Sequence, residues 1–191
     1  MKRIIAITGG IGSGKSYVCH LLSETYGIPV YDCDTEAKRL NEASPVIREA
    51  LIHLLGPEVY DNEGHLEKPV LARYLFQSEA HQQEVNAIIH PVVRQDFLAW
   101  AERQTSPIVA LESAILLESG FSDLADEIIT VTAPRSLRIQ RAMQRDGSTA
   151  QQVEQRIRLQ LTDEERTSQS HHVIINDGRE LKTQIEKTLN K

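Results

Sequence analysis

Residues 3–26 read RIIAITGGIGSGKSYVCHLLSETY, and this stretch decides the fold. The β-branched apolar run Arg3–Thr8 predicts a buried strand, which stops at a cluster of glycines. Lys15–Tyr26 then carries apolar side chains at helical spacing, and Gly27 predicts the end of that helix. A strand, a glycine-rich loop and a helix in this order predict the opening unit of an α/β fold.

The loop Gly9–Ser16 fits the pattern G-x-x-x-x-G-K-[ST], which is typical of proteins that bind nucleoside triphosphates. Glycines let consecutive backbone amides turn toward phosphate oxygens, and the amino end of the following helix adds positive potential. Lys15 supplies a charge near the β- and γ-phosphates, and the Ser16 hydroxyl would ligate magnesium. An ordinary glycine-rich turn and a dinucleotide-binding loop are the alternatives, but the second lacks the G-x-G-x-x-G spacing because position 15 is lysine. We therefore expect ATP and Mg²⁺ here, with nucleotide contacts from Gly10, Ile11, Gly12, Ser13, Gly14, Lys15, Ser16 and Tyr17.

Four further apolar runs predict strands, and helical patterns separate most of them. Strands that alternate with helices pair in parallel through right-handed crossovers, so we expect one sheet with helices on both faces. The expected strands are residues 28–31, 108–111, 127–132 and 172–175.

The segment between the second and third expected strands is different, because it shows helical periods and almost no convincing strand. It predicts an inserted helical subdomain over residues 33–104. Ser44 is placed to cap one helix that ends at Gly56, and a second helix begins near Ser78. Pro91 predicts a kink or break in that second helix after His90. A histidine satisfied at that kink is favoured over one that touches substrate.

Two aspartates come directly after the second expected strand. Asp32 and Asp34 would therefore emerge at the carboxyl edge of the sheet, where ligands of open α/β folds bind. A carboxylate there can accept the proton of an attacking hydroxyl, since phosphoryl transfer depends mainly on positioning. The structural alternative is a turn and a helix cap. Glu112 lies at the end of the third expected strand. It is equally expected to assist magnesium through a water molecule or to have a structural role.

Three arginines lie on roughly one face of a helix expected to start near Pro134: Arg138, Arg141 and Arg145. A movable arginine-rich flap over a triphosphate would neutralise charge and exclude water. A solvated helical face is the alternative for any one of them.

The composition of the chain limits the kinds of partner and the cellular location that we expect. With 191 residues, 40% of them hydrophobic, the chain can bury one substantial core. A net charge of -6 argues against a broad basic surface for nucleic acid, so a small-molecule partner is expected. No apolar run is long enough to cross a bilayer, and no signal peptide is recognisable, so we expect a cytosolic protein. Cys19 and Cys33 lack disulfide or zinc spacing and are expected to be reduced thiols.

Over nearly its full length the chain resembles the dephospho-CoA kinase family, the enzymes of the last step of coenzyme A synthesis. The glycine-rich loop alone is general to P-loop proteins, and the combination of motifs carries the resemblance. The matching motifs are residues 8–16, Asp32-Cys33-Asp34, His90-Pro91, residues 116–120, residues 141–146, Arg156-Ile157 with Gln160, and residues 173–176 with Gly178.

This resemblance implies a three-layer P-loop NTPase fold with a five-stranded parallel sheet, a CoA-binding helical insert at 33–104 and a lid at 142–166. It implies ATP-dependent phosphorylation of a ribose 3'-hydroxyl of dephospho-CoA. Asp34 is then the base with Asp32 assisting, while Lys15 contacts the γ-phosphate. The resemblance further implies a magnesium ligand at Ser16, lid contacts from Arg141 and Arg145, and a nucleotide contact at Asn176.

The chain departs from the family pattern at three places: Tyr17 where threonine is usual, Glu112-Ser113-Ala114 where the family shows an Asp, an apolar residue and Pro, and Ser170-His171 where it shows Ala-Asp. The second departure puts a role for Glu112 in doubt. Another small-molecule kinase, for a nucleoside or a nucleotide monophosphate, is the nearest alternative. A nucleotide-dependent switch is disfavoured since no N-K-x-D element is present near Asn176. The oligomeric state is left open.

Overall fold

The structure is a computed structural model that describes residues 2–189. The chain forms two compact units. The first consists of the residues up to Asp32 together with those from Gln104 onward, and the second is Cys33–Arg103. Within the described residues, no helix has both the length and the apolar character that a membrane span requires.

The first unit is built on a sheet of five strands, in the order β2-β3-β1-β4-β5. Every paired strand is parallel to its neighbour, so the predicted α/β fold class with a five-stranded parallel sheet is confirmed. The chain places β2 and β3 on one side of β1 and then crosses to place β4 and β5 on the other side, so the order of strands reverses at β1. The strands are β1 (Arg3–Thr8), β2 (Val30–Asp32), β3 (Ile108–Glu112), β4 (Glu127–Thr132) and β5 (His172–Ile175).

The second strand starts two residues later than the apolar run predicted. The backbone N–H of Ile28 donates to the carbonyl of Leu22 at 3.0 Å, and that of Gly27 donates to Ser23 at 3.1 Å. Both bonds close the carboxyl end of helix α1 (Lys15–Tyr26) around the left-handed Gly27. Because its amide serves the helix cap, Ile28 belongs to that turn, and pairing with β3 begins at Val30.

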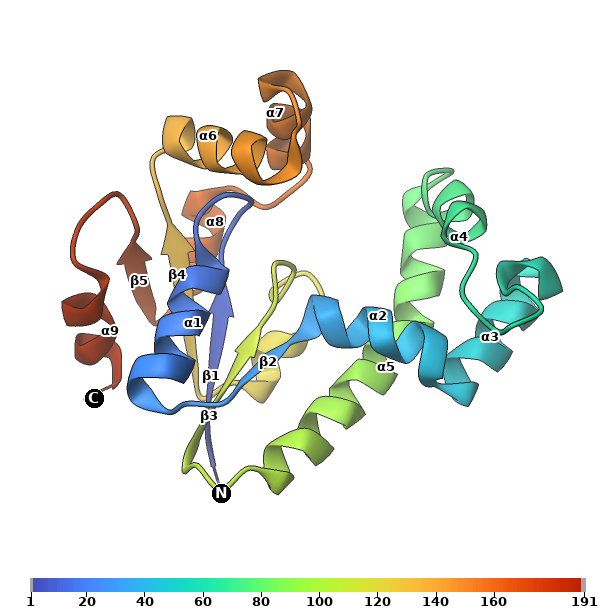
Figure 1. Ribbon diagram of the computed structural model, residues 1–191, viewed down its shortest axis with the longest axis horizontal. Coiled ribbons are helices and arrows are strands. Elements are labelled where there is room, and N and C mark those ends of the chain that lie inside the picture. Colours follow the sequence, from blue (N-terminus) through green and yellow to red (C-terminus); the bar gives the residue numbers. More distant parts are fainter. Residues whose placement is uncertain (1, 190–191) are drawn as a thin grey trace. The chain divides into compact units, whose positions relative to one another are not determined.

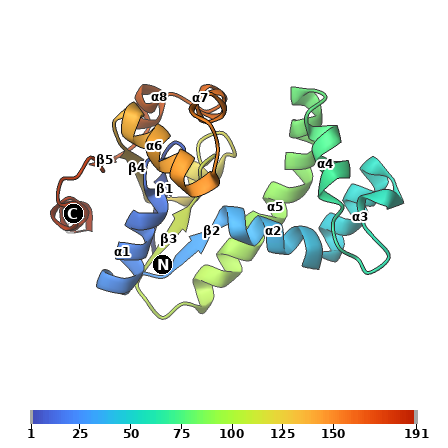
Figure 2. The same ribbon diagram turned by 45° about the horizontal axis from the view of Figure 1, so that its top comes forward.

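Helices surround the sheet in the first unit. In both views α1 runs beside β1, and α6 (Arg135–Asp146) and α7 (Ala150–Arg158) lie beyond the carboxyl ends of the strands (Figures 1 and 2). The shorter α8 (Asp163–Ser168) contacts β4, and α9 (Leu181–Leu189) contacts β5. A short 3-10 helix, Phe121–Leu124, precedes β4.

The core packs α1 and α9 against the sheet. Its fully buried members include Ile5 and Ile7 of β1, Val18 of α1 and Ile185 of α9. Each such side chain stabilises the fold by about 1.5–3 kcal/mol relative to exposure. The strand β1 and the first turns of α1 are thereby fixed in the most buried part of the unit, and the glycine-rich loop is anchored at both ends.

The second unit is helical, as the periodicity of the segment predicts. Helices α2 (Cys33–Ala43), α3 (Pro45–Leu55) and α4 (Lys68–Leu75) each contact the long α5 (Glu79–Arg103), and a short 3-10 helix, Pro57–Val59, follows α3. As expected, the Ser44 side chain caps α3, accepting a hydrogen bond from the amide of Ile47 at 3.4 Å, and Gly56 follows the last turn.

Of the kink or break expected after His90, the break is absent, because α5 continues through Pro91. The helix bends along its length in both views (Figures 1 and 2). Its buried side chains recur every four residues on both sides of the proline. They are Val85, Ile89, Val93, Phe97 and Ala101.

His90 in α5 gives the second unit a dependence on pH. Burial lowers the pKa of its imidazole below the ordinary value of 6.5. Below pH 6.5 the unfolded chain binds a proton at His90 more readily than the folded chain does. The free energy of unfolding is therefore at its full value above pH 6.5 and decreases as the pH falls below it. The Tm of wild type should drop more between pH 7.5 and pH 5.5 than that of His90→Gln. An equal drop in both proteins would contradict the expectation, and His20→Gln at an exposed position is the control.

Candidate active site

The loop between β1 and α1 has the backbone form that phosphate binding requires. Gly12 and Gly14 have φ of 73° and 92°, in the left-handed region where a side chain is strained. The amide of Ser13 donates to Gly10 at 3.1 Å, which closes the turn. Gly14 directly precedes α1, and the first amides of a helix have no partner within it. In α1 the Tyr17 amide turns back to the Gly14 carbonyl at 3.1 Å. The loop thus presents a helix amino end and a set of turned amides to the carboxyl edge of the sheet.

These glycines are also needed for space. A Cβ on Gly10 would collide with the guanidinium of Arg138, and one on Gly12 would collide with the Arg138 backbone. A Cβ on Gly14 would collide with the side-chain amide of Asn176. The loop is therefore held between α6 and the turn after β5, and its shape depends on residues far away in the sequence.

Replacing Gly14 should destabilise the protein more than replacing a glycine of similar φ in open space. Gly14→Ala adds left-handed strain of about 1–3 kcal/mol and displaces Asn176. Gly147, with φ of 64° and nothing within 4 Å of its added Cβ, is the matched position. Urea unfolding should give a larger loss of unfolding free energy for Gly14→Ala than for Gly147→Ala, whose cost is about 1–2 kcal/mol. Equal losses would show that the contact with Asn176 does not matter.

Ser16 and Glu112 meet at the edge of the sheet. The Ser16 hydroxyl donates to Glu112 Oε1 at 3.0 Å, and the register of β3 sets Glu112 opposite Asp32 on β2 and Ile7 on β1. Glu112 is nearly buried, with 9% of its surface exposed. This contact gives Glu112, whose role the sequence left open, a defined place beside the predicted magnesium ligand.

Cys19 lies beneath the same carboxylate. Burial first, and then the Glu112 charge and hydrogen bond, raise the pKa of the Cys19 thiol well above its usual range. The thiol stays protonated and donates to Glu112. Cys19 and Cys33 are both buried, and neither forms a disulfide, in agreement with the expected reduced thiols.

Asn176 fastens the loop from the other side. Its Nδ2 donates to the Ser13 carbonyl at 3.0 Å, and its own backbone amide donates to Thr132 at 2.8 Å. Arg141 Nη1 and Nη2 donate to the backbone oxygen and Oδ1 of Asn176 at 3.0 and 3.3 Å. Arg141 is thus brought next to the phosphate-binding loop, while Asn176 is 7% exposed and shapes the loop directly.

The three arginines expected on one face of α6 have separate surroundings. Arg138 points inward and is 4% exposed. Arg145 is exposed and pairs with its neighbour Asp146 at 2.7 Å, at the end of the helix away from Asn176. Arg166, one of the later arginines, is 1% exposed and lies 3.8 Å from Glu118. All three arginines lie on α6 as expected, and the alternative of a solvated face is wrong for Arg138, because Asp163 and the Ile11 carbonyl draw its side chain inside.

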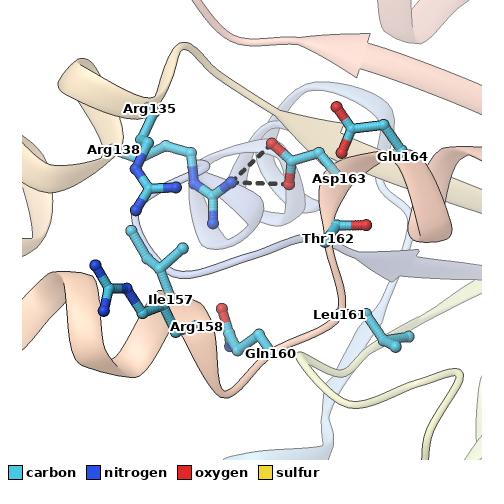
Figure 3. A pocket seen from close by; sticks show the side chains of 9 residues that line it. All are labelled: Arg135, Arg138, Ile157, Arg158, Gln160, Leu161, Thr162, Asp163 and Glu164. Carbon is cyan, nitrogen blue, oxygen red and sulfur yellow. Dashed lines mark hydrogen bonds and ion pairs between the residues drawn. The ribbon is translucent and has the colours of Figure 1, made fainter.

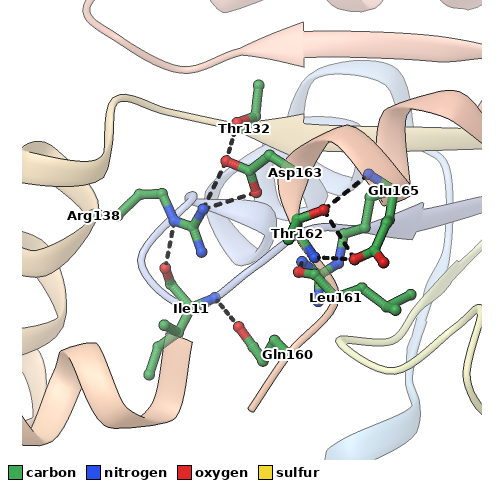
Figure 4. A network of polar contacts seen from close by, with 9 residues as sticks. Ile11, Thr132, Arg138, Gln160, Leu161, Thr162, Asp163 and Glu165 are labelled. Carbon is green, nitrogen blue, oxygen red and sulfur yellow. Dashed lines mark hydrogen bonds and ion pairs between the residues drawn. The ribbon is translucent and has the colours of Figure 1, made fainter. Parts of the chain in front are cut away.

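The sequence did not indicate that Gln160 and Arg138 both hold the backbone of the same loop residue, Ile11. Gln160 Oε1 accepts the Ile11 amide at 2.9 Å, and Arg138 Nε donates to the Ile11 carbonyl at 2.9 Å (Figure 4). The two Asp163 carboxylate oxygens each accept a hydrogen bond from Arg138 Nη1, at 2.8 and 2.7 Å. No local signal marks these partners, since they come together only through the fold.

Two cavities in the first unit are lined by residues that contact the loop or directly follow it. One of about 460 Å³ is lined by residues of α1 and of the segment that follows β5, including Tyr17, Asn176 and Arg179. The other, of about 440 Å³, lies between α6 and the α7–α8 segment and is lined on one side by Arg135 and Arg138 (Figure 3).

The remaining predicted residues lie on the elements expected of them. Lys15 is half-buried at the start of α1, Asp32 is the last residue of β2, and Asp34 is exposed in the first turn of α2, in the second unit. Among the described residues, no group of three or more His, Cys, Asp or Glu side chains is arranged to hold a metal ion. A magnesium ion at Ser16 would need further ligands from phosphate oxygens and water, which is how this ion is commonly bound.

The comparisons with known proteins agree with one another. The family model described as dephospho-CoA kinase matches residues 3–182. A dephospho-CoA kinase of Bacteroides fragilis is 50% identical over 175 residues, which are 91% of this chain and 84% of the relative. A crystal structure from Thermus thermophilus has a TM-score of 0.86 at 34% identity, covering 99% of this chain and 96% of that one. Dephospho-CoA kinase from Campylobacter jejuni, at 19% identity and a TM-score of 0.69, covers 100% and 96% of the two chains and shares the fold. The chain therefore belongs to the dephospho-CoA kinase family.

Proposed function

We propose that this protein phosphorylates the ribose 3'-hydroxyl of dephospho-CoA with ATP, giving coenzyme A and ADP. Membership of the family carries the choice of acceptor. The phosphate-binding loop, with Ser16 bonded to Glu112 at 3.0 Å, supports the use of a nucleoside triphosphate.

In the reaction the acceptor oxygen forms a bond to the γ-phosphorus while the bond to the β-phosphate oxygen breaks. Amides of the loop and of the first turn of α1 would hold the β- and γ-phosphates in line together with the Lys15 ammonium. The amides of Ile11, Ser13 and Tyr17 do not belong to this set, because they donate to Gln160, Gly10 and Gly14. Ser16, with Glu112 through water, would hold magnesium, which supplies neutralisation of phosphate charge. Arg141, held by Asn176, would stabilise charge on the transferring group.

Asp34 would accept the proton of the attacking hydroxyl, with Asp32 assisting. Asp32 ends β2 opposite Glu112, at the carboxyl edge of the sheet where the triphosphate loop lies. Asp34 follows two residues later at the amino end of α2. A carboxylate that orients and deprotonates the acceptor typically contributes about 10²–10⁴ in rate.

Other parts of the chain would hold the rest of the two substrates. The cavity of about 460 Å³ beside Tyr17 and Asn176 would take the nucleoside part of ATP. The helical insert, residues 33–104, would bind the CoA portion. Residues 142–166 would act as a lid that brings Arg145 toward the nucleotide and excludes water.

The experiment measures ADP formation from ATP and magnesium with dephospho-CoA, adenosine, AMP or no acceptor, and identifies the product by mass. Acceptor-dependent formation of coenzyme A is expected. If another acceptor were phosphorylated and dephospho-CoA were not, the protein would be a different small-molecule kinase and the proposal would be wrong.

A further inference from the structure

We infer that Gln160 links the lid segment to the phosphate-binding loop and is a positioning residue for phosphoryl transfer. The inference rests on the proposed function for its kinetic consequence. The contact itself is a feature of the first unit alone and can be tested without an acceptor.

Ile11 is fixed at both ends of its backbone by side chains from outside the loop. Its amide donates to Gln160 Oε1, and its carbonyl accepts from Arg138 Nε, each at 2.9 Å (Figure 4). Gln160 comes from the stretch that joins α7 to α8, and Arg138 comes from α6. Hydrogen bonds on both polar groups of one residue leave its peptide planes little freedom to rotate.

The two side chains are themselves joined. Arg138 Nη1 donates to both carboxylate oxygens of Asp163, and Asp163 Oδ2 also accepts from the Thr132 hydroxyl at the end of β4, at 3.0 Å. Gln160 and Asp163 are three positions apart along the chain. Hydrogen bonds between charged partners are shorter and stronger than neutral ones, and Arg138, which is 4% exposed, is shielded from water. Hydrogen bonds link Gln160 to Ile11, Ile11 to Arg138 and Arg138 to Asp163, and the backbone of residues 160–163 closes this ring.

The ring lies next to the residues that position phosphate. Ile11 is adjacent to Gly12, where a Cβ would collide with the Arg138 backbone, so a movement of α6 must shift the loop. The 440 Å³ cavity has Arg138 and Asp163 in its wall together with Gln160, and all three point toward the same space (Figure 3). A change in the α7–α8 segment is thus transmitted to the loop by a hydrogen bond and an ion pair.

The test begins with Gln160→Met, which keeps the length of the side chain and replaces the amide acceptor by a weak one. Hydrogen exchange of the Ile11 amide should become about tenfold faster or more. The kcat for coenzyme A formation should fall about tenfold while the KM for dephospho-CoA changes little, because a misplaced loop affects the transition state more than acceptor binding.

Two glutamines serve as comparisons. Gln169→Met removes a side chain at the end of α8 that bonds the Glu165 carbonyl at 3.1 Å, and it should leave exchange and kcat unchanged. Gln152→Met removes the capping box of α7 and so loosens the segment without touching the loop. It should leave Ile11 exchange unchanged. If exchange of the Ile11 amide were accelerated equally in Gln152→Met and Gln160→Met, the cause would be general loosening of the segment and the inference would be wrong. Exchange at the wild-type rate in Gln160→Met would also overturn it.

A double variant tests the ring. If Gln160 and Asp163 act on the same peptide, the combined loss of Ile11 protection in Gln160→Met/Asp163→Asn should be smaller than the product of the single losses. Independent, multiplicative losses would contradict the ring. These exchange measurements stand even if dephospho-CoA is not the acceptor, so failure of the proposed function would be visible separately.

Discussion

Lys15→Ala should lower kcat/KM for ADP formation by about a thousandfold or more. The lysine opens α1 directly after Gly14, so its ammonium starts from the point where the loop amides converge. A single preorganised group at a developing charge contributes about 10²–10³ in rate, and the lysine of this loop also binds the triphosphate before reaction. Both kcat and the KM for ATP are therefore expected to worsen.

The measurement is steady-state ADP release at varied ATP, with ATP binding followed by calorimetry. Lys187→Ala, an exposed lysine near the end of α9, is the matched control and should behave as wild type. Turnover in Lys15→Ala within a few fold of wild type would rule out the assigned role, provided that the variant unfolds at the wild-type Tm.

Asp34→Asn should reduce kcat by about 10²–10⁴ while ATP binding is retained. Asparagine keeps the shape of the side chain but cannot accept the proton of the acceptor hydroxyl. Because Asp34 is in the first turn of α2, an amide in its place also removes a favourable charge at the helix amino end, but this costs only about 0.3–1 kcal/mol of stability. The two effects are separable by comparing kcat with Tm.

Rapid-quench measurement of a single turnover isolates the chemical step. Glu42→Gln, at the exposed far end of the same helix, is the control and should have unchanged kcat. Asp32→Asn should cost less than Asp34→Asn, since Asp32 is the assisting residue. The assignment is wrong if the single-turnover rate of Asp34→Asn equals that of wild type.

The sequence alone was enough to predict the features that depend on residues near one another in the chain. The strand, loop and helix of residues 3–26 follow from composition and spacing within that stretch, and they form as predicted. The start of β2 was misplaced because an apolar residue can serve a strand or a helix cap equally well. Ile28 serves the cap, and only its hydrogen bond to Leu22 reveals this. The continuity of α5 through Pro91 likewise depends on packing that the proline signal does not include.

The support around the site could not be read from the sequence. The Ile11–Gln160 hydrogen bond joins residues 149 positions apart. Arg138 and Asp163 have charged side chains that are usually exposed to solvent, so nothing in the sequence indicated the ion pair. The spacing of the arginines predicted a shared helix face and left open whether each side chain was solvated, and a carboxylate in a later segment decides where Arg138 points. Glu112 shows the same limit, since its place at a strand end was evident while its bond to Ser16 required the register of β1 and β3.

The second unit enters the chain between β2 and β3, and these two strands are neighbours in the sheet. It therefore occupies the place of a single crossover connection. None of the paired strand residues belongs to Cys33–Arg103, so a change of length or sequence there is expected to leave the order and register of the five strands intact. In evolutionary terms the part of the insert after Asp34 is an exchangeable segment, because its replacement would change the acceptor-facing residues and keep both the phosphate-binding loop and the proposed base.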